Sequence, residues 1–216
     1  NAAVEVLAHA GFEATLPKTP LCCGRPLYDF GYLDLAKKKL EKILDAIGDE
    51  INSDPNAPIA VVGLEPGCMS VFKDELLKFF PDDPRARLLS ERVYLLGDFL
   101  HEHNYIPPKL DRNILVHAHC HQKSLFGTKG DVALLNALGA KANFIDSGCC
   151  GMAGTYGHLK EHQDNSVGLF KLNWHNTVTS ENVNYLASGF SCRSQSAKLA
   201  GKNLPHPVEI INKILN

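Results

Sequence analysis

Apolar residues recur at steps of three and four positions in several parts of the chain, which is the spacing of one helix face. The clearest case is the range 32–51, where lysines and acidic residues occupy the positions between the apolar ones. This pattern predicts an amphipathic helix over 32–51 that packs on a core. Further helices are predicted over 69–80, over 90–103 with Ser90 as its cap, over 159–174 and over 207–215.

Short apolar stretches lie between these helices and predict buried strands. The strands are predicted over 13–16, 59–63, 113–117, 142–145 and 184–187. Strands that alternate with helices favour parallel sheets covered by helices, so the fold class is α/β. We expect a small, mostly parallel sheet flanked by helices in each of two tandem modules.

The two modules are indicated by an internal duplication. Residues 3–24 and 132–151 both contain a short apolar helix, a glycine, a strand-like stretch and then Cys-Cys-Gly. A further cysteine follows in each copy, Cys68 in the first and Cys192 in the second, at separations of 45 and 42 positions. Two pseudo-symmetric copies of one module are the simplest account.

The break between the copies falls at the adjacent prolines 107–108, because neighbouring prolines stop helix and strand alike. We therefore predict a first module over residues 1–108 and a second over residues 109–216. The chain begins at Asn1 and not at a methionine, so we expect the natural chain to continue upstream.

The seven cysteines are the main chemical signal. Four of them form two adjacent pairs, and the peptide bond between neighbouring residues holds their Cα atoms too close for a relaxed disulfide. Metal ligands or redox thiols in a reducing compartment are the better interpretation. The candidate metal ligands are Cys22, Cys23, Cys68, Cys120, Cys149, Cys150 and Cys192.

The second module has the more complete set of thiols. Cys120 ends an additional strand 29 positions before Cys149, and the same spacing puts the equivalent cysteine of the first module about seven positions before Asn1. Four thiolates suit an iron–sulfur cluster or zinc. Ligands scattered across a whole module favour the cluster, because structural zinc sites usually bring short Cys-x-x-Cys knuckles.

Other polar residues surround these cysteines. His117, His119 and His121 alternate around Cys120, and an extended chain sends them to the face opposite its sulfur. We interpret them as hydrogen-bonding partners that orient the sulfurs, in preference to ligands. Glu65 has two interpretations, an oxygen ligand or a solvated carboxylate.

Composition bears on which partners the chain binds and in which compartment it lies. The 22 lysines and arginines nearly balance the 24 acidic residues, with a net charge of −2, so nothing favours nucleic acid as a partner. The longest apolar runs, 59–62 and 114–116, are far shorter than the roughly 20 residues of a transmembrane helix. We expect a cytoplasmic protein without a transmembrane segment, with peripheral association at the inner membrane as the alternative.

Four stretches resemble a known family. They are LCCGRPLYDFG at 21–31, HCH at 119–121, DSGCCGMAG at 146–154 and GFSCR at 189–193. These motifs are similar to those of the cysteine-rich CCG domain. That domain occurs in heterodisulfide reductase, in the iron–sulfur subunit of glycolate oxidase and in anaerobic glycerol-3-phosphate dehydrogenase. The motifs are most similar to the C-terminal part of bacterial FAD-linked oxidases of the D-lactate and D-2-hydroxyglutarate dehydrogenase type.

The resemblance implies an iron–sulfur electron-transfer segment of a flavin-dependent 2-hydroxyacid dehydrogenase. FAD on an upstream flavin domain of the same chain or complex then oxidises the hydroxy acid, and a 4Fe-4S cluster passes electrons to quinone or a redox protein. This chain would be part of an oxidoreductase and inactive as an isolated fragment. Two alternatives stay open: a thiol/disulfide reductase of the heterodisulfide reductase type, and a zinc-stabilised docking module.

The chain departs from the family pattern at one motif. The family's Cys-x-x-Cys stands here as Glu65-x-x-Cys68 and as Gly189-x-x-Cys192, so each copy has one thiolate fewer. Noncubane clusters with five cysteines are therefore in doubt. The second module, with four cysteines, is the better candidate for a bound centre.

Overall fold

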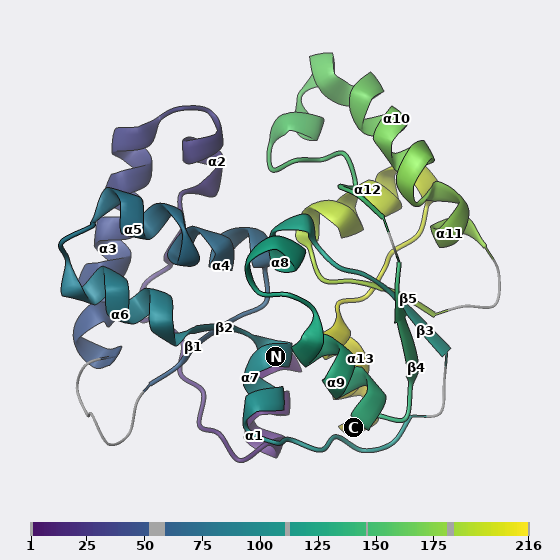
Figure 1. The fold of residues 1–216 in the computed structure, drawn as a ribbon, viewed down its shortest axis with the longest axis horizontal. Coiled ribbons are helices and arrows are strands. Elements are labelled where there is room, and N and C mark those ends of the chain that lie inside the picture. Colours follow the sequence, from purple (N-terminus) through teal and green to yellow (C-terminus); the bar gives the residue numbers. More distant parts are fainter. Residues whose placement is uncertain (1, 52–58, 111–112, 146, 181–183, 216) are drawn as a thin grey trace. The chain divides into compact units, whose positions relative to one another are not determined.

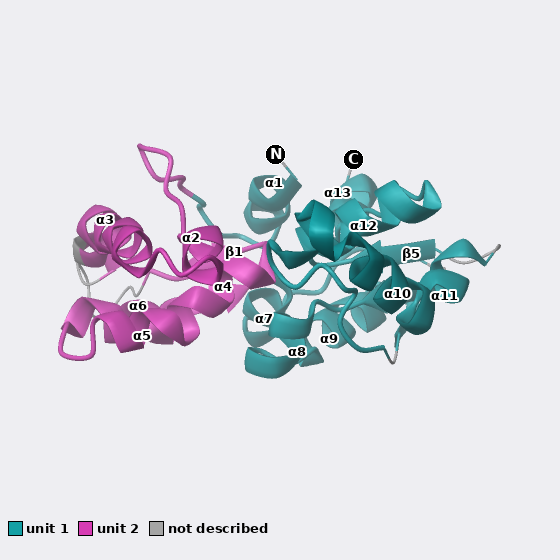
Figure 2. Cartoon of the chain, turned by 90° about the horizontal axis from the view of Figure 1, so that it is seen from above, with its two compact units in different colours: residues 1–14, 96–216 teal, residues 15–95 magenta. Residues whose placement is uncertain are grey.

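The chain forms two compact units in the computed structural model, which describes all residues except 1, 52–58, 111–112, 146, 181–183 and 216. Unit 1 comprises Asn1–Ala14 and Leu96–Asn216, and unit 2 comprises Thr15–Leu95 (Figure 2). Each unit contains a small parallel sheet with helices around it, so the α/β class is confirmed. The module boundary at residue 108 concerns the sequence repeat and stays a prediction.

Unit 2 contains the two-stranded parallel sheet. Its strands are β1 (Val61–Gly63) and β2 (Val93–Leu95), with Val61 paired to Val93. Its helices are α2 (Arg25–Asp29), α3 (Leu33–Ile51), α4 (Pro66–Lys73), α5 (Glu75–Phe79) and α6 (Pro84–Arg92). The apolar face of α3 is buried at Ala36, Leu40, Ile43 and Leu44, as its periodicity predicts.

Unit 1 contains the three-stranded parallel sheet, in the order β4-β3-β5 (Figure 1). The strands are β3 (Asn113–His117), β4 (Lys141–Phe144) and β5 (Asn184–Ala187). Its helices are α1 (Ala2–His9), α7 (Leu96–Glu102), α8 (Cys120–Leu125), α9 (Lys129–Ala137), the short 3₁₀ turns η1 (Tyr156–His158) and η2 (Lys160–His162), α10 (Gln163–Asn173), α11 (His175–Thr179), α12 (Phe190–Ala200) and α13 (Pro207–Leu215). Helical crossovers join the strands, as parallel pairing requires.

Helices α7 and α9 cross closely because glycines stand at their contact. A Cβ on Gly97 would overlap Oδ1 of Asp131 and lie 3.0 Å from its Cγ. A Cβ on Gly130 would overlap Oδ1 of Asp98 and lie 2.5 Å from its Cα. The crossing therefore brings two carboxyl groups together inside unit 1.

Three predicted elements differ from the structure. Residues 13–16 form no strand, and Leu16 is 70% exposed, so this stretch has neither a paired neighbour nor a buried face. Ser90 is not a cap, because α6 begins at Pro84, where the Asp83 carboxylate accepts a 2.9 Å hydrogen bond from the Arg85 N–H. Residues 93–95, predicted as helix, form β2.

Two further predicted helices are divided. The helix predicted over 69–80 is interrupted at Asp74 into α4 and α5. The helix predicted over 159–174 starts with 3₁₀ turns, and regular helix begins only at Gln163. By contrast, the bounds of β3, β5 and α13 agree with their predicted ranges.

Candidate metal centre

The structure divides the seven cysteines between the two units. Cys22, Cys23 and Cys68 lie in unit 2, and Cys120, Cys149, Cys150 and Cys192 lie in unit 1. The unit 1 cysteines follow the carboxyl ends of three adjacent parallel strands, and such ends meet at one edge of a sheet. Strand β3 leads to α8, β4 leads to the Cys-Cys-Gly loop, and β5 leads to α12. The residue that opens the family-like stretch of this loop, Asp146, lies outside the described residues.

The four thiols of unit 1 are linked in one chain of contacts. Cys120 and Cys149, Cys149 and Cys150, and Cys150 and Cys192 are close enough that each thiol shifts the pKa of the next. The predicted set is thus brought together from segments more than 70 positions apart in the sequence.

These contacts divide the protons unevenly among the thiols. The hydrogen bond from Cys120 lowers the pKa of Cys149 far below its ordinary value, and the bond from Cys150 lowers the pKa of Cys192. Their donors, Cys120 and Cys150, have raised pKa values because they keep the shared protons and are partly desolvated. These shifts favour the thiolate form at Cys149 and Cys192. A bound cation would displace the remaining protons.

The Cys-Cys-Gly loop is shaped by Gly151. This residue has a φ of 101°, which favours glycine, and its N–H donates to the Cys149 sulfur at 3.4 Å. The glycine of the first copy, Gly24, has a φ of 76°. The backbone thus turns sharply after both cysteine pairs, as the sequence predicts.

His117 is a hydrogen-bonding partner of the set. It donates to Cys192, and its Nδ1 lies 3.2 Å from Oγ of Ser147. The ring is buried and stacks on Trp174, with centroids 4.1 Å apart and planes at 20°. Trp174 belongs to the same hydrophobic cluster as Cys150 and Cys192. Three of the four thiols, those of Cys149, Cys150 and Cys192, therefore lie at the apolar core of unit 1.

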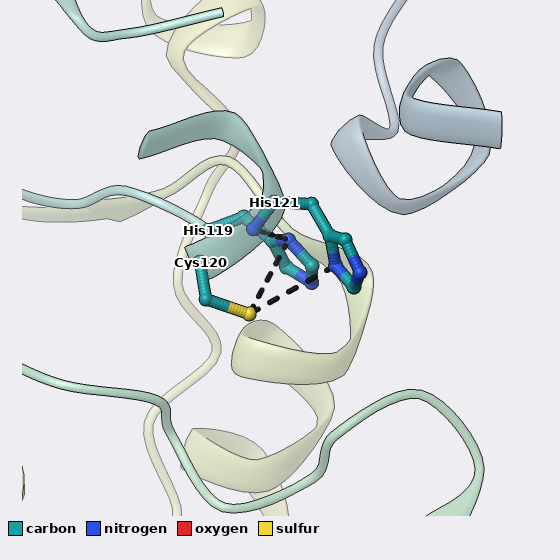
Figure 3. A group of neighbouring side chains, drawn as sticks. All are labelled: His119, Cys120 and His121. Carbon is teal, nitrogen blue, oxygen red and sulfur yellow. Dashed lines mark hydrogen bonds between the residues drawn. The ribbon is translucent and has the colours of Figure 1, made fainter. Parts of the chain in front are cut away.

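His119 and His121 lie beside the Cys120 sulfur (Figure 3), contrary to the expectation that they face away from it. The Nδ1 atoms are 4.0 Å and 3.9 Å from this sulfur, and the three ligand atoms lie within 4.8 Å of one another. The prediction fails because the extended strand ends before Cys120. His119 is the cap residue of α8, so the alternation of faces stops there.

A buried polar chain that the sequence did not reveal holds the His119 backbone. The His119 N–H donates to Ser188 Oγ at 3.0 Å, Ser188 donates to Gln122 at 2.6 Å, and Gln122 donates to Asp131 at 2.6 Å. Burial raises the pKa of Asp131. The pKa of Asp98, across the helix crossing, is raised to about 6 by burial and by the charge of Asp131. Polar residues at such positions resemble solvated ones, so no sequence signal identifies them.

The unit 2 cysteines form a smaller set. Cys23 is buried and hydrogen-bonded to Cys68, which lowers the pKa of Cys23 to about 7 and raises that of Cys68. Cys22 is exposed. Glu65, a candidate oxygen ligand, caps α4 by accepting from the Gly67 N–H at 3.2 Å. The structure thus links one pair of thiols here.

Among the helices of the described ranges, none has the length and apolar character to cross a membrane.

Comparisons with known proteins agree on one family. The profile of the CCG family, described as a cysteine-rich domain, matches residues 1–73 and 114–189. The D-2-hydroxyglutarate dehydrogenase of Pantoea ananatis (strain AJ13355) is 31% identical over 98% of this chain and 20% of its own length. Lactate utilization protein A of Bacillus subtilis (strain 168) is 28% identical over 72% of this chain and 66% of its own length.

A third relative is one component of a larger dehydrogenase. This component of the anaerobic glycerol-3-phosphate dehydrogenase of Escherichia coli (strain K12) is 30% identical over 77% of this chain and 42% of its own length. The chain spans about a fifth of the length of the D-2-hydroxyglutarate dehydrogenases that it matches.

Proposed function

Because the chain belongs to the CCG cysteine-rich domain family, we propose that it is an iron–sulfur electron-transfer segment of a flavin-dependent 2-hydroxyacid dehydrogenase. The relatives carry the names of dehydrogenases, a dehydrogenase component and a lactate utilization protein. The observation that carries the proposal is the linked chain of four thiols at one sheet edge of unit 1.

The donor set fits a 4Fe-4S cluster. Four thiols, of which two have lowered pKa values, are the ligands that such a cluster takes. The residues that would hold it are Cys120, Cys149, Cys150 and Cys192. When bound, the cluster accepts and releases single electrons.

The spacing of the sulfurs favours a cluster over zinc. In a tetrahedral zinc site with Zn–S bonds of about 2.3 Å, every pair of sulfurs lies roughly 3.8 Å apart. In the part of the chain that the structure describes, the one group of three or more ligand atoms that all lie within 4.8 Å of one another is His119, Cys120 and His121. No three of the four sulfurs therefore all lie within 4.8 Å of one another, whereas a single zinc ion would hold every pair closer than that.

The surroundings of the thiols would tune such a centre. The Gly151 N–H and the His117 ring donate to the sulfurs of Cys149 and Cys192, and hydrogen bonds to sulfur are one lever that sets a reduction potential. The hydrophobic cluster around Cys150 and Cys192 keeps water from that side. These residues orient the ligands and control solvent access.

The remaining parts of the electron path are proposals from the relatives' larger size. We propose that FAD on an upstream flavin domain delivers the electrons and that quinone or a redox protein accepts them. We propose D-2-hydroxyglutarate as the hydroxy acid, because it is the substrate in the name of the first relative. The two matched segments support two modules, 1–108 and 109–216. In the first module, Cys22, Cys23 and Cys68 are proposed ligands of a second centre completed by an upstream cysteine.

The test is the metal content of the chain purified without oxygen. We expect brown protein with about four irons and four acid-labile sulfides per chain, as one four-thiolate cluster gives. Colourless protein with one zinc per chain would reject the proposal and favour the zinc-stabilised docking module. Unfolding midpoints before and after chelation show whether the metal contributes to stability.

A specific observation favours thiol/disulfide reduction as a second candidate. With a pKa of about 7, Cys23 is substantially thiolate at neutral pH and lies beside Cys68. Its thiolate can attack a disulfide substrate and release one thiol, after which Cys68 attacks the mixed disulfide, releases the second thiol and leaves a Cys23–Cys68 disulfide. Stoichiometric release of two thiols per reduced chain supports this candidate, provided that Cys23→Ser abolishes it and Cys22→Ser does not.

A further inference from the structure

A glycine at position 189 is required by the space available for a side chain and not by the backbone conformation. Gly189 has φ −86° and ψ 138°, an extended conformation that any residue adopts. A Cβ at this position would overlap Cδ2 of His119 and lie 2.9 Å from its Cγ. The imidazole of His119 therefore occupies the space that a side chain of residue 189 would take.

That space lies next to the sulfur set. Residue 189 caps α12 and Cys192 lies three positions later, so side chains at the two positions share one side of the helix. In the family pattern noted above, the first cysteine of Cys-x-x-Cys stands at residue 189. The His119 ring thus lies where the side chain of that cysteine would be.

The His119 ring also has the protonation state of a ligand. Its Nδ1 accepts a 3.2 Å hydrogen bond from the His121 backbone N–H, so this nitrogen carries no proton. The same nitrogen lies 4.0 Å from the Cys120 sulfur (Figure 3). The residue is 5% exposed. The lone pair is therefore held, out of water, on the side of the first thiol.

We infer that His119 Nδ1 is a second ligand of the iron that Cys120 would hold, from a ring that fills the space of a side chain at residue 189. The inference rests on the proposed iron–sulfur function and specifies its ligand set as four thiolates and one imidazole. Compared with a thiolate from residue 189, a neutral imidazole would leave the centre less negative, and histidine ligation raises the potential of iron–sulfur centres. Nδ1 would give up the hydrogen bond from His121 when iron binds.

The test is pulsed electron paramagnetic resonance on the 216-residue chain, labelled with [¹⁵N]histidine, reconstituted with iron and sulfide without oxygen and reduced with dithionite. We expect hyperfine coupling to a histidine nitrogen that disappears in His119→Ala and persists in His121→Ala, the matched control. Four irons without histidine coupling in the unsubstituted chain would overturn the inference and leave the proposed function standing. Absence of iron would overturn both.

An exchange of the two side chains gives a second readout. Gly189→Cys alone is expected to lower the melting temperature and the iron content, because its Cβ meets the His119 ring. His119→Ala combined with Gly189→Cys is expected to recover both, without histidine coupling and with a lower reduction potential. If Gly189→Cys alone is as stable as the unsubstituted chain, or if the double variant is worse than both single ones, the replacement is refuted.

Discussion

The two cysteine sets share a local motif but differ in what surrounds it. Both Cys-Cys-Gly sequences turn at a glycine with positive φ. In unit 1 the motif lies beside two further strand ends that each lead to a cysteine, and four thiols are linked. In unit 2 the segment before the motif forms no strand, β2 leads to no cysteine, and one pair of thiols is linked. The number of neighbouring strand ends that lead to a cysteine thus differs between the two copies of the motif, and the number of linked thiols differs with it.

The sharpest test of this comparison removes one thiol from each set. Cys149→Ser, in the middle of the linked chain, is expected to abolish iron binding after anaerobic reconstitution, because it breaks contacts on both sides. Cys22→Ser, an exposed position in unit 2, is expected to retain about four irons per chain. Equal losses in the two variants would contradict the difference drawn between the sets.

A second test weakens the core beneath the unit 1 set. Trp174 is buried in the cluster that contains Cys150 and Cys192, so Trp174→Ala is expected to lower the free energy of unfolding by about 3–5 kcal/mol. The control is Leu172→Ala in α10, the helix that ends just before Trp174; Leu172 is 79% exposed, and its replacement should change this free energy by less than about 0.5 kcal/mol. Urea unfolding measures both. Similar effects from the two would show that this part of unit 1 does not pack as described.

A third test concerns the helix crossing that supports α9. Gly130→Ala would bring a methyl group against the backbone of Asp98, at a cost of about 1–3 kcal/mol in unfolding free energy. Gly168→Ala is the matched control, because a Cβ there meets nothing within 4 Å in α10. It should stabilise the chain by about 0.5–1 kcal/mol through helix propensity. Thermal unfolding of the two variants should therefore shift in opposite directions.

The smallest expected effect is a pH dependence within unit 1. The pKa of Asp98 is about 6 in the folded chain against an ordinary value of 3.8, so folding favours its protonated form. Stability from this group is complete below pH of about 4 and is lost as pH rises to about 6. Asp98→Asn should remove this loss, measured as the difference in urea midpoint between acidic and neutral pH. The exposed Asp82→Asn should leave it in place.

The sequence predicted elements whose own pattern determines them. Strands β3 and β5 are compact apolar stretches, and α13 begins at a proline, so local signals sufficed. Strand β2 was missed because Val93, Tyr94 and Leu95 continue the apolar pattern of their neighbours, and only pairing with β1 identifies them as a strand. The reverse error occurred at 13–16, where an apolar pattern finds no partner. Strand assignment depends on contacts that one sequence does not contain.

Part of the candidate site could also be predicted from the sequence. The duplication identified the cysteines, because a repeated thiol is visible in the sequence itself. The partners of these cysteines were not visible. His117 meets Trp174 across 57 positions, and Gly189 accommodates His119 across 70. Such pairs are decided by tertiary packing, and neither residue type alone indicates its role.

The uneven burial of the unit 1 thiols gives the centre an inner and an outer side. Cys150 and Cys192 are buried in the apolar core, whereas Cys120 and Cys149 are half-buried. Small oxidants and chelators therefore reach the outer pair first, so a cluster of the proposed kind would lose the iron at Cys120 and Cys149 before the iron at the buried pair.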